Sequence, residues 1–187
     1  MLTVILTGGS SRRMGRDKAL LPYAGGTLLQ TLVSRFGAFG PVGVSVDRTG
    51  RFPVSGATEL IDRYPGAGPM NGVVSGFRET EADELLLTAV DLPYADPALA
   101  LRLSALRGGA DACVVRRGAD GIEPLFAVYG RGCLAAAEDC LAQGRRSLRA
   151  LLERVEVRYA LPKELPGFDL ERIYTNVNTQ EEYRRLK

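Results

Sequence analysis

Short apolar runs alternate with segments of helical periodicity along this chain, and this alternation restricts its fold more than any other feature. The first run, Leu2–Leu6, is continuous, as in a strand buried on both faces, and it leads into glycines. After it, Thr27 can cap a helix whose apolar residues from Leu28 to Phe36 fall on one face. Strands that alternate with helices form a mostly parallel sheet with helices on both faces. We therefore expect an α/β fold.

The pattern continues to the end of the chain and predicts a single domain over residues 1–187, without an internal repeat or a long linker. The expected strands are residues 2–6, 42–46, 59–61, 84–90, 112–115, 123–129 and 155–161. The expected helices are residues 28–36, 70–79, 97–107, 132–143, 147–154 and a last one opened by the capping box of Thr179 and Glu182. A short GADG turn joins the strands at 112–115 and 123–129, which favours an antiparallel pair. The strand at 155–161 is expected at a sheet edge.

Composition excludes several kinds of chemistry. The chain has no histidine, so a histidine general base, a Ser-His-Asp triad and a histidine-bound metal are excluded. Cys113, Cys133 and Cys140 follow no zinc spacing and are expected to be buried thiols. A net charge of +2 argues against a nucleic-acid partner. No apolar run approaches the roughly 20 residues that cross a membrane, and the start lacks signal-peptide features. We expect a cytoplasmic protein.

A glycine-rich and basic segment, LTGGSSRRMGRDK, occupies residues 6–18, directly after the first strand. Gly8 and Gly9 let the backbone approach a ligand closely, and Arg13 and Lys18 are among four cations that suit a polyphosphate. The segment matches neither the Walker A pattern nor GxGxxG. Open parallel sheets bind ligands at the carboxyl ends of their strands. The segment is therefore a candidate phosphate site, and the alternative is a basic turn over the sheet.

Three aspartates also follow expected strands. Asp91 ends the most apolar one and suits Mg²⁺, which takes one or two carboxylates together with substrate phosphates; alternatively it caps the turn before the next helix. Asp62 could accept the two adjacent N–H groups of guanine, which adenine and cytosine lack, or it closes a turn at a strand end. Asp47 taken alone is a turn residue.

Together these motifs resemble one family, the MobA molybdenum cofactor guanylyltransferases. The family's LAGGxSxRMGxDK opening is similar to residues 6–18, its Asp with a following GPLAG to Asp62 and residues 68–72, and its CDxP to residues 90–93. Its PLFALY and NVNTPEE motifs are similar to residues 124–129 and 176–182, so the resemblance spans essentially the whole chain. The chain departs from the family at Thr7, Asp47 and residues 70–71.

The resemblance implies a three-layer α/β/α Rossmann-like nucleotidyltransferase fold with a mostly parallel mixed sheet. It implies transfer of GMP from GTP to the terminal phosphate of molybdopterin, with Mg²⁺ as cofactor. By position, the implied nucleotide contacts are Leu6, Thr7, Gly8, Gly9, Lys18, Asp47, Asp62 and Asp91. The implied catalytic residues are Lys18, Asp91 and Arg13, with Asp91 as the metal ligand. The implied acceptor-side residues are Arg145, Arg146, Asn176 and Asn178.

The resemblance also implies partners: a molybdenum-insertion protein, and apo-molybdoenzymes or their chaperones, around a monomer or weak oligomer. Two alternatives stay open. One is the related molybdopterin cytidylyltransferase, although Asp17 before Lys18 favours the guanylyl branch, because cytidylyl relatives tend to carry Pro-Lys there. The other is a non-catalytic nucleotide-binding adaptor for molybdoenzyme maturation, against which the joint presence of Lys18 and Asp91 argues.

Overall fold

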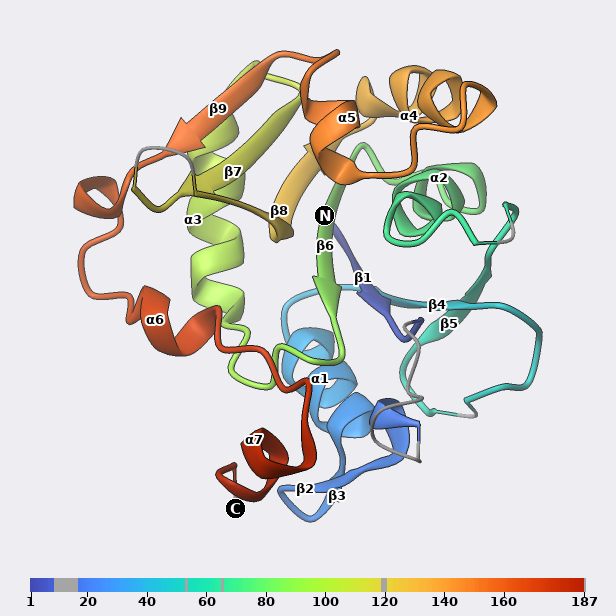
Figure 1. Cartoon of the computed structure of the whole chain (residues 1–187), viewed down its shortest axis with the longest axis vertical. Coiled ribbons are helices and arrows are strands. Elements are labelled where there is room, and N and C mark those ends of the chain that lie inside the picture. The colour runs from blue at the N-terminus through green and yellow to red at the C-terminus, as the bar shows by residue number, and fades with distance from the viewer. Residues whose placement is uncertain (9–16, 53, 65, 119–120, 187) are drawn as a thin grey trace.

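A computed structural model describes residues 1–8, 17–52, 54–64, 66–118 and 121–186 (Figure 1). The strands are β1 (Leu2–Leu6), β2 (Pro22–Tyr23), β3 (Gly26–Thr27), β4 (Val42–Val46), β5 (Thr58–Ile61), β6 (Glu84–Ala89), β7 (Ala112–Arg116), β8 (Ile122–Gly130) and β9 (Val157–Ala160). The α-helices are α1 (Leu28–Gly37), α2 (Met70–Arg78), α3 (Pro97–Arg107), α4 (Cys133–Ala142), α5 (Leu148–Leu152), α6 (Leu170–Ile173) and α7 (Gln180–Arg184). Two 3-10 turns, η2 (Lys18–Leu20) and η3 (Pro162–Glu164), join them.

Seven strands form one sheet in the order β5-β4-β1-β6-β8-β7-β9. β1 pairs in parallel with β4 on one side and with β6 on the other. β8 is antiparallel to both of its neighbours, β6 and β7. The expected mostly parallel mixed sheet is confirmed, together with the antiparallel pair of β7 and β8 and the edge position of β9. The insertion of β8 between β6 and β7 does not follow from the order of the strands in the sequence.

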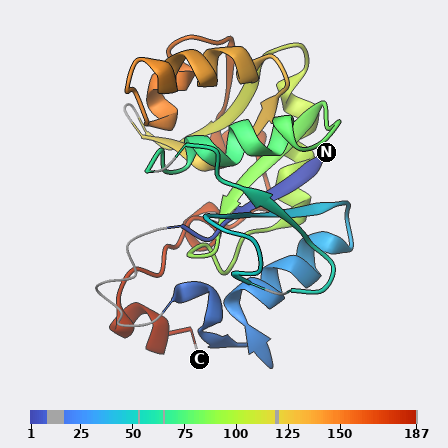
Figure 2. The same cartoon turned by 90° about the vertical axis from the view of Figure 1, so that its right-hand side faces the viewer.

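Helices cover both faces of this sheet. Alternation along a strand sends neighbouring side chains to opposite faces. In β1, Val4 packs with apolar residues of α2, α4 and α5, whereas Ile5 packs with those of α1, α3 and α6. Figure 2 shows α2 and α4 side by side on the first of these faces. The expected three-layer α/β/α arrangement is confirmed.

Before α1, residues 17–27 fold into a small structure that the sequence does not predict. Its hairpin, β2 and β3, turns at Ala24 and Gly25 with φ values of 49° and 83°, which are typical of a type I′ turn. Strands of two residues leave no periodic pattern in a sequence. In both views α7 lies beside this hairpin (Figures 1 and 2), and the Tyr183 hydroxyl donates to the Pro22 carbonyl at 2.5 Å. The end of the chain thus returns to the segment that follows β1.

Two expectations from composition have structural counterparts. Cys113, Cys133 and Cys140 are free and buried, as predicted. Burial raises the pKa of the Cys113 thiol to about 11 and that of Cys133 to about 12, so neither is a reactive thiolate. Within the described ranges, no helix is long and apolar enough to cross a membrane.

Candidate active site

The strand order creates a topological switch point at β1. From β1 the chain moves outward through β4 and β5, and it then returns to β6 on the other side of β1. The carboxyl ends of β1 and β6 lie together, because the Val90 amide donates to the Leu6 carbonyl at 3.0 Å. Ligands of open α/β sheets bind outside the carboxyl ends of the strands at such a point. Three predicted residues, Leu6, Thr7 and Gly8, therefore border the candidate site together with Asp91.

Lys18 and Asp91 face each other at this edge. The Nζ atom of Lys18, in η2, lies 3.6 Å from Oδ2 of Asp91 and donates to Oδ1 of Asn178 at 2.9 Å. Both charged side chains are largely buried, with 18% of Lys18 and 25% of Asp91 exposed. The Val177 amide donates to the Asp91 carbonyl at 2.9 Å, which fixes the C-terminal segment beside β6. The structure thus joins Lys18 to Asp91 and adds Asn178, which the resemblance implied for the acceptor side.

Asp91 does not cap a helix. The N-cap of α3 is Asp96, whose Oδ1 accepts from the Ala98 amide at 2.8 Å. Oδ1 of Asp91 is buried and has no hydrogen-bond partner within the described part of the chain. A buried, unpaired carboxylate oxygen suits a hard divalent cation. Among the described residues, no group of three or more acidic or cysteine side chains could hold a metal.

A second polar group connects the ends of β1, β4 and β5. The Thr7 hydroxyl donates to the Ser45 carbonyl at 2.6 Å, and the Ser45 hydroxyl donates to Oδ1 of Asp62 at 2.5 Å. Burial raises the pKa of Asp62, and the hydrogen bond from Ser45 opposes that rise. Ser45 carries no motif, and the sequence analysis missed it. The hydroxyl that distinguishes Thr7 from the family's usual alanine is bonded to the protein itself.

Asp47 lies beside this group and is more exposed, at 53% of its side chain. Its Oδ1 lies 2.8 Å from Nη1 of Arg51, and Nη2 of Arg51 lies 3.0 Å from Oδ2 of Asp17. The hydrogen bond from Arg51 holds the pKa of Asp47 below its usual range. Arg51 could not be predicted from the sequence, because a single arginine in a loop carries no pattern.

The loop that follows Asp62 is closed by Asn71, at one of the positions where the chain departs from the family. The Tyr64 amide donates to Oδ1 of Asn71 at 3.0 Å, and Nδ2 of Asn71 donates to the Tyr64 carbonyl at 2.6 Å. Gly66 and Gly68 have φ values of 72° and 62°, a region that favours glycine. This double hydrogen bond fixes the loop that leads from Asp62 into α2.

The structure separates the two arginines that the resemblance implied for the acceptor side. Nη1 of Arg146 donates to the Gly66 carbonyl at 3.3 Å, so this arginine reaches the loop after Asp62. Arg145 instead forms an ion pair with the exposed Glu153. Only the first of them is therefore connected to the candidate site through contacts of the described residues.

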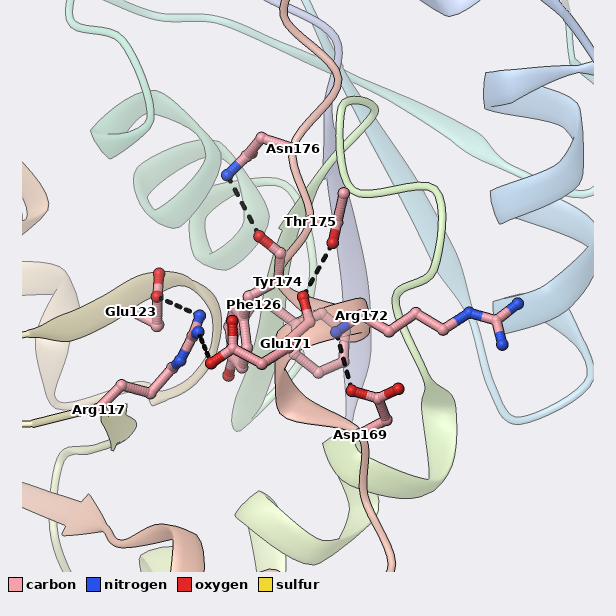
Figure 3. Close-up of polar contacts among 9 residues, drawn as sticks. All are labelled: Arg117, Glu123, Phe126, Asp169, Glu171, Arg172, Tyr174, Thr175 and Asn176. Atoms are coloured by element: carbon pink, nitrogen blue, oxygen red, sulfur yellow. Dashed lines mark hydrogen bonds and ion pairs between the residues drawn. The ribbon is translucent and has the colours of Figure 1, made fainter. Parts of the chain in front are cut away.

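Figure 3 shows how the C-terminal segment is anchored before it reaches the site. The Tyr174 hydroxyl donates to the Phe126 carbonyl at 3.1 Å. Nδ2 of Asn176 donates to the Tyr174 carbonyl at 3.4 Å, as the dashed line in Figure 3 marks. Phe126 is buried in β8 with a φ of 55°, an unusual value for a residue other than glycine. Asn176 is thus held by its own segment, whereas Asn178 contacts Lys18. The predicted residues Gly9 and Arg13 lie outside the described residues.

Comparisons with known proteins give one consistent result. Residues 3–159 match the family model of the MobA-like NTP transferase domain. A probable molybdenum cofactor guanylyltransferase of Opitutus terrae is 39% identical, over 86% of this chain and 84% of that protein. The molybdenum cofactor guanylyltransferase of Syntrophotalea carbinolica is 31% identical, over 98% of this chain and 89% of that protein. The crystal structure of molybdopterin-guanine dinucleotide biosynthesis protein A from Archaeoglobus fulgidus matches with a TM-score of 0.84 at 25% identity, over 100% of this chain and 96% of that one.

Proposed function

The chain belongs to the MobA-like NTP transferase family, and from this premise we propose that it transfers GMP from GTP to the terminal phosphate of molybdopterin. A phosphate oxygen of the acceptor attacks the α-phosphorus of GTP. The bond from that phosphorus to the α–β bridging oxygen breaks, and pyrophosphate leaves with the electron pair. The product is the molybdopterin guanine dinucleotide cofactor.

This reaction suits a chain without histidine. The acceptor phosphate is already an anion, so no strong base has to create the nucleophile. The protein must instead align two anions that repel each other and neutralise the charge that develops on the leaving pyrophosphate. The observation that carries the proposal is the pair of Lys18 and Asp91 at the switch point, where the Nζ to Oδ2 distance is 3.6 Å.

We assign Lys18 to the phosphates of GTP and Asp91 to Mg²⁺. An ammonium on a flexible stem suits a single phosphate oxygen. Asp91 would hold the ion through Oδ1, which is buried and without a hydrogen-bond partner within the described ranges. When bound, Mg²⁺ neutralises charge on the phosphates. Lys18 then neutralises the phosphate charge that Mg²⁺ does not compensate. The amide oxygen of Asn178 accepts from the Lys18 ammonium and keeps it oriented.

We assign Asp62 to the base. The Ser45 hydroxyl donates to Oδ1 of Asp62 at 2.5 Å, which restrains this carboxylate just after the end of β5. Guanine offers two adjacent N–H donors that can pair with the Asp62 carboxylate. A base without these donors would leave the carboxylate unpaired, so its nucleotide would bind more weakly. The cytidylyltransferase alternative predicts no such preference. Leu6, Thr7, Gly8 and Gly9 would contact the guanosine through their backbone, and Arg13 would assist at the phosphates.

Further proposals concern the setting of the reaction. We propose that residues 1–187 act as one domain in the cytoplasm, where GTP is supplied, and that the chain works as a monomer or weak oligomer. A molybdenum-insertion protein would act on the same pterin, and apo-molybdoenzymes or their chaperones would receive the product.

The first test is a thermal-shift panel with GTP, CTP, ATP and UTP, each with and without Mg²⁺. A ligand at about 100 times its Kd adds about 2.7 kcal/mol, which raises the Tm of a domain of this size by roughly 5–10 °C. We expect a shift for GTP that Mg²⁺ enlarges, followed by GMP transfer to molybdopterin in a direct assay. A shift with CTP alone would favour the cytidylyltransferase. Binding of GTP without Mg²⁺-dependent turnover would favour the adaptor.

A further inference from the structure

Arg51 lies in the loop after β4 and joins two carboxylates that are distant in the sequence. Its Nη1 lies 2.8 Å from Oδ1 of Asp47, and its Nη2 lies 3.0 Å from Oδ2 of Asp17. The guanidinium also stacks over the ring of Phe52, at 5.0 Å from the ring centre, and that ring is itself buried. Only 25% of the Arg51 side chain is exposed. The guanidinium is therefore held by two carboxylates at its edges and by the ring of Phe52 against one face.

Asp17 connects Arg51 to Lys18, the next residue in the chain. One carboxylate oxygen, Oδ2, faces Arg51, and the other, Oδ1, accepts from the Ala19 amide at 3.2 Å and caps η2. Both oxygens of Asp17 are thus used. Lys18 is the first residue of η2, and its Nζ reaches Asn178 at 2.9 Å and Asp91 at 3.6 Å. Arg51 is consequently connected to the ammonium of Lys18 through one capping residue.

We propose that Arg51 and Asp47 are positioning residues: they hold Asp17, and through Asp17 they place the Lys18 ammonium where it meets the nucleotide phosphates. The inference rests on the proposed function, in which Lys18 binds the phosphates of GTP. A lysine side chain loses conformational entropy when it binds a ligand. If the backbone of Lys18 is already held in place, less entropy remains to be lost on binding. In this account Asp47 acts through Arg51 and not by contact with the nucleoside, which differs from what the family resemblance implied.

The test is a set of GTP dissociation constants measured by titration calorimetry at a fixed Mg²⁺ concentration. Arg51→Met keeps the length of the side chain and removes its charge. We expect it to weaken GTP binding roughly three- to tenfold, the effect of one partly buried ion pair on an affinity. Arg51→Lys should recover part of the loss, because it keeps one charge. Arg48→Met is the matched control, since Arg48 is 74% exposed, 3.9 Å from Asp47, and is not joined to Asp17 by any ion pair of the described residues; it should bind GTP as the unaltered chain does.

Two double variants separate this role from a general effect on folding. In a Lys18→Met background, Arg51→Met should change GTP binding less than about twofold, because its effect passes through Lys18. In an Arg51→Met background, Asp47→Asn should have no further effect. Equal losses in the altered and unaltered backgrounds would overturn the proposal, as would an Arg51→Met variant that binds GTP normally. If the unaltered chain does not bind GTP, the proposed function fails, and this inference fails with it.

Discussion

Gly72→Ala is a test of how closely α2 must approach the sheet beside the site. A Cβ atom at Gly72 would lie 2.4 Å from Cδ2 of Leu6 and 2.8 Å from Cδ1 of Leu87. Real Cβ contacts essentially never fall below 3.0 Å, so both leucine side chains would have to move. Both are buried, with exposed fractions of 6% and 0%. The glycine is therefore required for packing, although it sits in the segment that resembles the family's GPLAG motif.

The size of the effect follows from two opposing terms. Overpacking a well-filled core costs about 1–3 kcal/mol, and alanine regains about 1 kcal/mol over glycine inside a helix. Because two buried side chains are displaced, we expect a net loss of about 1–2 kcal/mol. Gly37→Ala is the matched control, since Gly37 ends α1 and a Cβ there meets nothing within 4 Å. That variant should gain about 0.5–1 kcal/mol.

Urea unfolding measures both variants against the unaltered chain, and a shifted midpoint at constant slope reports stability alone. Titration of GTP on the same samples reports the site. Since Leu6 is the last residue of β1 and borders the candidate site, Gly72→Ala should also weaken GTP binding, whereas Gly37→Ala should not. The reasoning is refuted if Gly72→Ala is as stable as Gly37→Ala, because the close contacts would then carry no free energy.

Three further substitutions test the site and its support. Asp91→Asn keeps the shape but removes the charge beside Lys18, and it should lower turnover by the equivalent of about 2–4 kcal/mol; initial rates over a Mg²⁺ series check this, and an unchanged rate would exclude Asp91 as a metal ligand. Asp62 has a folded pKa raised by burial, so it stabilises the fold at pH values below its unfolded pKa, and that stability is lost as the pH rises through the folded pKa. Asp62→Asn should therefore raise the Tm at neutral pH while GTP loses its advantage over CTP, and the Tm gain should shrink toward pH 3; a gain independent of pH would contradict the assignment. Tyr174→Phe removes the hydroxyl that donates to the Phe126 carbonyl and should cost about 1–3 kcal/mol in urea unfolding; an unchanged midpoint would contradict a stabilising role for this hydrogen bond.

The regular elements of the fold were predictable because each carries its period in its own residues. β1, β4 and α3 begin and end where the sequence predicts. The β2–β3 hairpin and α6 were missed, since elements of two and four residues are too short for a periodic pattern to repeat within them. The position of β8 was missed for another reason. Its pairing with β7 is local, but its pairing with β6 joins strands on either side of α3 and is decided by packing.

The predicted site residues stand at strand ends, and the missed ones support them from elsewhere in the chain. Lys18, Asp62 and Asp91 were found because parallel strands bring their carboxyl ends to one edge. Ser45 and Arg51 were missed because they contact residues far away in the sequence: Asp62 lies 17 residues from Ser45, and Asp17 lies 34 residues from Arg51. Such contacts leave no trace in local patterns.

The partners of the carboxylates at this edge explain why GTP and a divalent cation should bind together. Asp17 and Asp47 share Arg51, and Asp62 accepts from Ser45. Asp91 faces Lys18 with one oxygen, while its other oxygen is buried and unpaired within the described ranges. A triphosphate that draws Lys18 toward itself leaves Asp91 less neutralised, and a buried carboxylate without a partner is unfavourable. A divalent cation on the free oxygen removes that cost, so each ligand should strengthen the binding of the other.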